Sequence, residues 1–335
     1  MKFLKTQIEE CNNEKIWNQA LKKHGCIPFF FSWKWKNVLQ KTYPWMKPHY
    51  YIYKDSILPG FSYKKTYLSI PFCEYGGIIS NKKEEKEELL KKLKNDFKDK
   101  KIILKNNSVD NESSENLLLH RSKKLVTYIN DLKKSEKELF SKLRKTTRHS
   151  IGYAQKDGVK VKEISNKKEI KKFYDIYLST IKKNKGVPQP KILFDEIYKL
   201  QKTNDALILI SELKGTILSG IVLLFNKTYA SYYISANSKD AYKYHANHLI
   251  IWKAILSAKK RGMEKFDFGA AMTGSAGETF KRGWGGERKI LFKDSNVLDE
   301  TPKKSGLARK MLGIIPKTAM KVSVQTLNKK AFDYM

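Results

Sequence analysis

The sequence predicts an α/β protein with mixed, largely antiparallel sheets in two similar halves. A chain of 335 residues accommodates two domains at roughly 100–200 residues each, and a hydrophobic content of 41% is enough to form cores. Helical and strand-like segments follow one another in a similar order in both halves. In the second half, Lys214-Gly215 and Asn226-Lys227 separate successive strand-like runs, as hairpin turns do. That sheet is therefore expected to be antiparallel at its core.

In the first half, two helical segments precede a series of short strands and one highly charged helix. The first helix is centred on Ile16–Leu21, and Ser32 is placed to cap the second. The expected strands are 49–58, 67–79, 101–105, 116–120 and 124–130, with the charged helix at 82–98 and a polar loop at 106–116.

A long helix from Ser135 to Gly158 is expected to join the two halves. Ser135 and Glu138 form a capping-box pattern, and the apolar residues that follow keep a helical spacing. The expected elements after it are strands 159–164, 206–214, 216–225, 228–237 and 265–269 and helices 167–183, 192–200 and 244–260. We assign residues 1–145 to an N-terminal domain, 146–300 to a C-terminal catalytic domain and 301–335 to a basic tail.

The charge of the chain indicates a polyanionic partner. There are 67 Lys and Arg residues against 34 Asp and Glu residues, a formal net charge of +33. This exceeds what solubility requires. A Lys-, Asn- and Ile-rich composition is also typical of an AT-rich genome, with lysines covering a solvated surface, but those lysines still create a positive field.

The remaining composition favours a reducing compartment without a metal site. Cys11, Cys26 and Cys73 are odd in number and lack a C-x-x-C pair. The N-terminal residues become charged within a few positions, and no later run approaches the ~18 apolar residues of a membrane span. We therefore expect a cytoplasmic protein, with peripheral contact at the inner face of an anionic membrane as a further possibility.

The segment FDFGAAMTGSAGETFKRGWGGERKIL carries the clearest chemical signal. A strand ends at Asp267-Phe268-Gly269, a loop of small residues follows, and a short helical segment then presents Phe280, Lys281, Arg282 and Trp284. Free backbone N–H groups and lysine charge favour an anion-binding site there. The alternative is structural, with Asp267 capping a turn, Phe280 and Trp284 in the core and the lysines on the surface.

Four segments together resemble the FemAB-like acyltransferases. The DFG strand end followed by Phe280-Lys281 is similar to that family's C-terminal signature, and Leu143–Val159 resembles its linker helix. FYDIYLSTIKKNKGVP resembles its helix-plus-GxP element, and HANHLIIWKAILSAKKRG resembles its helix with Asn247, Leu249 and Trp252. The resemblance is good over 143–291 and covers the N-terminal half only in pattern.

The resemblance implies two tandem GNAT-like acyltransferase domains and an amide-forming reaction. It places Lys281 where the acyl group is transferred, with Phe280 beside it, and a fixed ammonium there would stabilise the oxyanion of the reaction. Further substrate-binding candidates are Lys36 and Arg148 for phosphate groups, Tyr233 and Asp267 for the attacking amine, and Arg282 and Trp284 in the same segment. No general base is assigned.

The expected donor is aminoacyl-tRNA, and the expected acceptor is an amine of a nucleotide- or lipid-linked cell-envelope precursor. No resident cofactor is expected. The R/Q-x-x-G-x-G/A turn that binds the pyrophosphate of acyl-CoA is not found after a central strand. An acyl-CoA-dependent N-acyltransferase of polysaccharide sugars stays open as an alternative, and so does a non-catalytic nucleic-acid- or membrane-surface-binding protein. The oligomeric state is left open.

Overall fold

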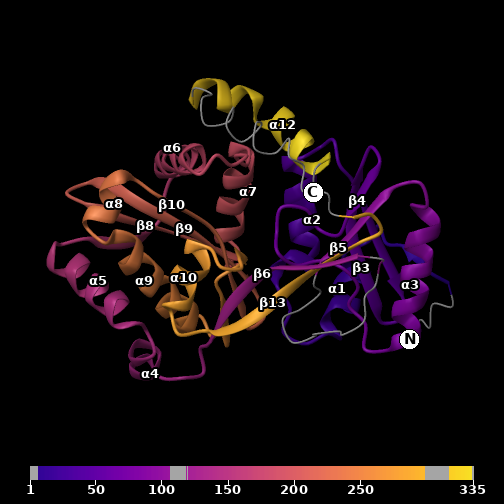
Figure 1. Ribbon diagram of the computed structural model, residues 1–335, viewed down its shortest axis with the longest axis horizontal. Coiled ribbons are helices and arrows are strands. Elements are labelled where there is room, and N and C mark those ends of the chain that lie inside the picture. Colours follow the sequence, from indigo (N-terminus) through magenta and orange to yellow (C-terminus); the bar gives the residue numbers. More distant parts are fainter. Residues whose placement is uncertain (1–6, 106–117, 119, 299–316, 334–335) are drawn as a thin grey trace. The chain divides into compact units, whose positions relative to one another are not determined.

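The computed structural model describes residues 7–105, 118, 120–298 and 317–333, which divide into two compact units (Figure 1). Unit 1 takes in the chain up to Val126, a segment that begins at Ile290, and the end of the chain from Lys329. Unit 2 contains Thr127–Lys289 and the stretch that ends at Asn328. The expected boundary between residues 145 and 146 falls inside unit 2.

The chain passes between the units within strands rather than within a joining helix. It enters unit 2 within β6 (His120–Asp131) and returns within β13 (Glu287–Ser295). The helix α12 (Lys317–Asp333) lies within the expected tail, whose residues 301–316 are outside the described chain.

Unit 1 contains a mixed sheet flanked by helices. Its strands are β1 (Glu9–Glu10), β2 (Lys47–Tyr53), β3 (Ser56–Tyr63), β4 (Thr66–Leu68), β5 (Lys101–Lys105) and the end of β13, hydrogen-bonded in that order. Only the β4–β5 pair is parallel. The helices are α1 (Glu14–Lys22), α2 (Trp33–Thr42) and α3 (Lys83–Asp96), with a short 3-10 turn at Phe29–Phe31.

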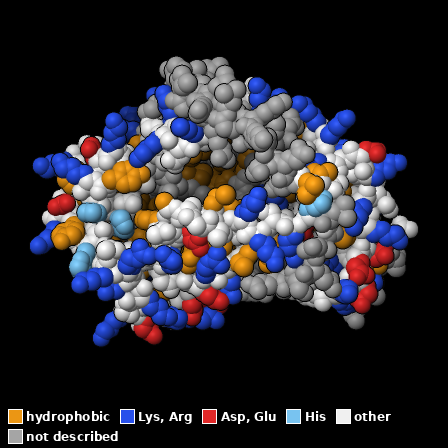
Figure 2. Space-filling model, in the orientation of Figure 1, with side chains coloured by type: hydrophobic (Ala, Val, Ile, Leu, Met, Phe, Trp, Pro, Cys, Tyr) orange, Lys and Arg blue, Asp and Glu red, His pale blue; other side chains and the backbone are white. Residues whose placement is uncertain are grey.

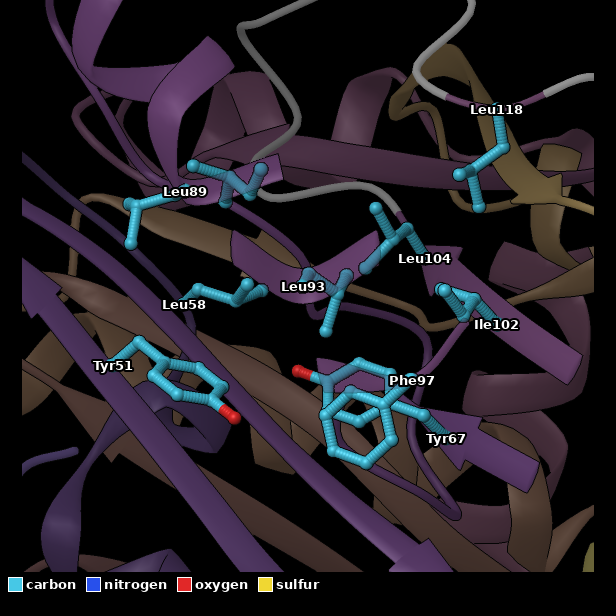
Figure 3. Packing of buried hydrophobic residues seen from close by; sticks show 10 residues of the cluster. Tyr51, Leu58, Tyr67, Leu89, Leu93, Phe97, Ile102, Leu104 and Leu118 are labelled. Carbon is cyan, nitrogen blue, oxygen red and sulfur yellow. The ribbon is translucent and has the colours of Figure 1, made fainter. Parts of the chain in front are cut away.

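Adjacent tyrosines of β2 pack on opposite faces of this sheet, as the two-residue period of a strand requires. Tyr50 contacts the rings of Trp17 and Trp33, with centroid distances of 4.5 Å and 5.7 Å. Tyr51 belongs to a different cluster, in which α3 buries Leu89 and Leu93 (Figure 3). The tyrosines of β2 therefore contribute to two cores, one on each side of the sheet.

A buried ion pair fixes the end of β13 within unit 1. Arg121 donates from Nε and Nη2 to the two carboxylate oxygens of Asp294, at 2.6 Å and 2.7 Å. Their side chains are 7% and 4% exposed. Bidentate geometry of this kind satisfies a buried carboxylate that would otherwise be costly to desolvate.

Unit 2 contains a sheet with helices on both faces (Figure 1). Its strands, in hydrogen-bonded order, are β6, β11 (Lys265–Asp267), β10 (Tyr229–Asn237), β9 (Thr216–Asn226), β8 (Ala206–Leu213) and β7 (Lys160–Glu163). The helices α6 (Lys167–Lys183) and α7 (Lys191–Gln201) cover one face, and α9 (Ala246–Lys260) packs on the other with α5 (Lys145–Lys156). The short elements are α4 (Glu136–Ser141), α8 (Lys239–Lys243), β12 (Ala271–Met272) and α10 (Ala276–Arg282). The α/β prediction with mixed, largely antiparallel sheets is confirmed.

One predicted helix is interrupted and another begins later than expected, each for a local reason. The helix expected from Ser135 to Gly158 does begin with the capping box, but it ends at Ser141 and restarts at Lys145. Arg148 donates to the carbonyls of Ser141 and Leu143, which satisfies helix-end acceptors at this break. The helix expected from residue 244 begins at Ala246, because His245 has a left-handed backbone with φ of 50°.

Strand predictions in the first half were wrong in two places. The strand expected at 49–58 is a hairpin of β2 and β3, with Lys54 at φ of 51° in the turn between them. Of residues 67–79 only the start is a strand, because Ile70 and Phe72 adopt φ of 30° and 58°, which extended backbone excludes. The expected loop at 106–116 and most of the strand 116–120 lie outside the described residues.

A close approach between β9 and α6 predicts that Gly220 cannot be enlarged. A Cβ atom at Gly220 would lie 2.4 Å from the ring of Phe173, which is fully buried. We expect Gly220→Ala to lower the free energy of unfolding by about 1–3 kcal/mol through overpacking. Urea denaturation measures this.

The matched control is Gly152→Ala on α5, where no atom lies within 4 Å of the added Cβ. This exposed helical position should gain up to about 1 kcal/mol. Equal stabilities of the two variants would contradict the packing described here.

Candidate active site

A pocket of about 380 Å³ in unit 2 lies where α6, β9, β10, α9 and α10 meet. Its polar lining comes from amide, hydroxyl and ammonium groups. These are Asn184, Tyr232, Ser235, Asn237, Tyr242, Asn247 and Lys281. The apolar lining consists of Ile221, Ile250, Ile251, Phe268 and Phe280 together with backbone at Gly220 and Gly277.

The pocket opens where two parallel strands part. The ladder between β10 and β11 runs only from Tyr229–Lys265 to Ser231–Asp267. β10 continues to Asn237, with a bulge between Tyr232 and Ile234. A bulge bends and twists its strand, and here it brings Tyr232 and Ser235 into the pocket wall.

Asp267 holds the end of β11 and the start of the loop that follows. Its side chain is 1% exposed. It accepts hydrogen bonds from the hydroxyls of Thr127 and Tyr229 and from the backbone N–H of Gly269. A buried carboxylate needs such donors, so this network fixes the backbone at Gly269.

Lys281 is attached to the same loop. Its Nζ donates to the carbonyls of Gly269 and Ala270, both at 2.7 Å. The side chain is half-buried and lines the pocket. Asp267 therefore positions Gly269, and Gly269 in turn helps to fix the ammonium of Lys281.

The helix α10 is held by hydrogen bonds to Glu278. Ser275 caps the helix by accepting from the backbone N–H of Glu278. The Glu278 carboxylate accepts from the N–H of Gly274 and from Arg288 Nε, at 2.6 Å and 2.9 Å. These bonds, which lower the pKa of Glu278, keep its negative charge outside the pocket lining.

An aromatic cluster packs against residues that line the pocket. Trp284 is fully buried, and its ring lies 6.1 Å from that of His248 and 6.0 Å from that of Phe280. Burial, with a smaller contribution from His245, lowers the pKa of His248 to about 4. His248 is therefore neutral at physiological pH.

The lining supplies hydrogen-bond donors and a positive charge but no acid. Among the described residues that form the pocket wall there is no Asp, Glu or His side chain. Burial raises the pKa of Tyr232 to about 12, so that its phenol stays protonated. Such a lining favours a carbonyl oxygen or an oxyanion over a cation.

The structure brings some of the predicted residues together and leaves others apart. Lys281 and Phe280 line the pocket. Asp267 and Trp284 are buried and do not line it. Of the two adjacent tyrosines of β10, Tyr232 lines the pocket, whereas Tyr233 sits at the bulge. Arg282, next to Lys281, is exposed.

The two phosphate candidates make contacts within the chain. Arg148 donates to backbone carbonyls at the end of α4. Lys36 belongs to unit 1, where its Nζ lies 3.6 Å from the centre of the Trp33 ring. Burial lowers the pKa of this lysine.

Several lining residues were not predicted. Asn184 follows α6, Asn237 ends β10, and Ser235 lies two residues before it. Polar residues at the ends of adjacent elements are a signal that sequence alone could offer, but the bulge that rotates Tyr232 inward leaves no such trace. Asn247 was noted only as part of a helix motif.

The described part of the chain shows neither a metal cluster nor a spanning helix. Within it, no three His, Cys, Asp or Glu side chains gather so as to hold a metal ion. No helix in those ranges combines the length and hydropathy that crossing a bilayer requires.

Comparisons with known proteins concern the fold. A model of the acetyltransferase (GNAT) domain family matches residues 141–282. A crystal structure of FemX has a TM-score of 0.67 at 16% identity, covering 90% of this chain and 100% of FemX. A search among curated proteins finds no match.

Two further solved structures share the fold. The C-terminal domain (DUF2156) of a putative lysylphosphatidylglycerol synthetase from Agrobacterium fabrum has a TM-score of 0.59 at 13% identity, covering 92% of this chain and 96% of that one. A tandem GNAT protein from the clavulanic acid biosynthesis pathway has a TM-score of 0.52 at 9% identity, covering 87% of this chain and 99% of that one. The prediction of a tandem GNAT-like fold is confirmed.

The lowered pKa of His248 predicts an acid-dependent loss of stability. An unfolded histidine titrates near 6.5 and His248 near 4, so the unfolded state binds more protons between these values. The free energy of unfolding should therefore fall as pH decreases from about 6.5 to about 4, by roughly 3 kcal/mol in all. Urea denaturation across this range measures it.

His248→Asn should remove this part of the slope. A proton NMR titration that placed the pKa of His248 near 6.5 would contradict the burial described.

Proposed function

We propose that this chain, whose residues 141–282 match a model of the acetyltransferase (GNAT) domain family, is a FemAB-like acyltransferase that transfers an aminoacyl group from aminoacyl-tRNA to an amine. The acceptor amine belongs to a nucleotide- or lipid-linked precursor of the cell envelope. The observation that carries the proposal is the pocket at the end of the β10–β11 ladder, with Lys281 fixed in its wall.

The reaction needs positive charge where the pocket provides it. The acceptor amine attacks the ester carbonyl of the donor, and a tetrahedral oxyanion forms. When this intermediate collapses, the carbon–nitrogen bond is kept and the bond to the ribose oxygen breaks. The proton lost by the amine ends on the departing ribose hydroxyl. A pre-placed ammonium stabilises the charge that develops on the carbonyl oxygen.

A basic surface next to the pocket supports a polyanionic donor. We call it the basic patch and define it by Lys134, Lys142, Arg144, Lys145 and Arg282. The backbone N–H of Arg144 donates to the carbonyl of Gly283 at 2.9 Å, which joins the α4–α5 segment to the segment after α10. Lys281, one residue before Arg282, lines the pocket.

Within the described chain no ion pair joins the five side chains of the basic patch to a carboxylate. The charges of Glu138 and Asp131 act on Lys142 from farther away, and Glu138 accepts hydrogen bonds from Ser135 in the capping box. The ammonium of Lys134 lies close enough to lower the pKa of Lys142. Two facing ammonium groups favour a bound phosphate over solvent. Figure 2 shows Lys and Arg side chains spread over much of one face.

A donor assay tests the proposal directly. The protein is incubated with a mixture of charged tRNAs or with acetyl-CoA, and loss of each donor is followed in the presence of an amine acceptor. Turnover of one aminoacyl-tRNA supports the proposal. Turnover of acetyl-CoA alone would replace it with an acyl-CoA-dependent reaction, and turnover of neither would favour a binding protein.

Lys281→Met should remove most of the activity and preserve the fold. Methionine keeps an apolar stem of similar length, but the charge that meets the oxyanion is gone. We expect a loss of about 100- to 1,000-fold in kcat, as for other single electrostatic groups. Turnover and thermal midpoint are measured together.

The matched control is Lys289→Met. Lys289 lies on β13 and pairs with the exposed Glu287 at 2.6 Å, so its loss should leave the rate unchanged. Similar losses in both variants, or full activity of Lys281→Met, would remove Lys281 from the proposed reaction.

Binding of tRNA should depend on the basic patch and on salt. Each phosphate contact contributes up to about 0.9 to the slope of log affinity against log salt. The double variant Lys142→Gln/Arg144→Gln should therefore bind more weakly at low salt and have a slope smaller by up to about 2. Filter binding at several salt concentrations measures this.

The control is Lys168→Gln/Lys172→Gln on α6, which removes the same charge from an exposed surface elsewhere in unit 2. If both pairs changed the slope equally, binding would follow net charge alone and the basic patch would have no special role.

A further inference from the structure

We propose that Asn247 contacts the substrate: its side-chain amide donates a hydrogen bond to the carbonyl oxygen of the acyl group, and His248 holds that amide in position. This inference rests on the proposed acyl transfer. It adds a second donor to Lys281 and assigns a positioning role to a histidine outside the pocket wall.

The amide of Asn247 is buried but uncommitted. Asn247 lies in the first turn of α9, is 9% exposed and lines the pocket. Its Oδ1 lies 3.0 Å from His248 Nδ1. Its Nδ2 has no hydrogen-bond partner among the described residues. Because Asn247 lines the pocket, these two N–H donors are available there to a bound acceptor.

His248 decides which end of the amide faces the pocket. Because Asn247 Oδ1 can only accept, His248 Nδ1 must carry the proton in this contact. The ring of His248 packs against those of Phe280 and Trp284, with centroid distances of 5.6 Å and 6.1 Å. With Oδ1 engaged by this ring, the amide can present only Nδ2 to the substrate.

The surroundings favour an oxygen acceptor. The wall contains the ammonium of Lys281 and no carboxylate among its described residues. The positive end of the α9 dipole lies at the same turn as Asn247. Two of the Lys281 donors bind the carbonyls of Gly269 and Ala270. A second side-chain donor is therefore needed to surround the developing oxyanion, and Asn247 supplies it.

Kinetics separate this role from packing. Asn247→Leu preserves approximate size and should lower kcat about 100-fold or more with little change in KM, because the lost bond strengthens in the transition state. His248→Leu should also lower kcat. His248→Asn places an amide donor near the former position of Nδ1. Most of the kcat that is lost in His248→Leu should therefore be kept in His248→Asn. The donor is the one turned over by the unaltered protein in the donor assay.

A binding measurement does not require turnover. In protein labelled with ¹⁵N at asparagine, the side-chain amide of Asn247 is followed by NMR during titration with sodium acetate, a small oxyanion, against sodium chloride. The unaltered protein should show a saturable shift of this signal. His248→Leu should weaken it, and His248→Asn should keep it.

The two measurements fail in different ways. A saturable acetate shift without turnover of any donor would reject the proposed function and leave the Asn247 site standing. An Asn247 signal unaffected by acetate, or Asn247→Leu with full kcat, would overturn the inference. Equal losses in His248→Leu and His248→Asn would also overturn the positioning role.

Discussion

The hydrogen bonds accepted by Asp267 are the constraint on which the candidate site depends. Its buried carboxylate joins three parts of unit 2: Thr127 of β6, Tyr229 of β10 and the backbone of Gly269. At this carboxylate the β10–β11 ladder stops and the loop that receives Lys281 begins. Because a polar group that is 1% exposed needs its hydrogen-bond donors, the three parts cannot shift independently. Asp267 thus acts through the geometry of its neighbours, without lining the pocket.

This arrangement also separates acidic from basic groups. Asp267 is enclosed by donors below the pocket, and Glu278 is held by Gly274 and Arg288 beside it. The wall itself keeps one ammonium and several neutral amides and hydroxyls. A low-dielectric site with fixed donors stabilises new negative charge without having to reorient at the moment of reaction. The chemistry of acyl transfer, in which a carbonyl oxygen becomes an oxyanion, suits this distribution.

Local pattern predicted the elements well wherever side-chain caps and periodicity agree. The helix expected at 167–183 has those bounds as α6, because Asn166 caps it and a continuous apolar stripe buries it. What could not be predicted depends on tertiary contacts. The left-handed His245 sets where α9 begins, and the bulge after Tyr232 sets which tyrosine faces the pocket. Neither feature can be recognised from residue type. Strict alternation along β10, without the bulge, would turn Tyr233 toward the pocket.

The basic residues of the chain differ in whether their charge is already in contact with other groups. Lys36 and Arg148 are candidates for phosphate contacts. Yet the ammonium of Lys36 stacks on Trp33 at 8% exposure, and Arg148 serves the carbonyls of Ser141 and Leu143. For either to bind a phosphate, it would have to leave a contact that already satisfies part of its charge. The residues of the basic patch have no such contact to give up within the described chain. A phosphate-bearing substrate is therefore expected to meet exposed cations that the fold leaves unpaired, while the buried cations hold the scaffold.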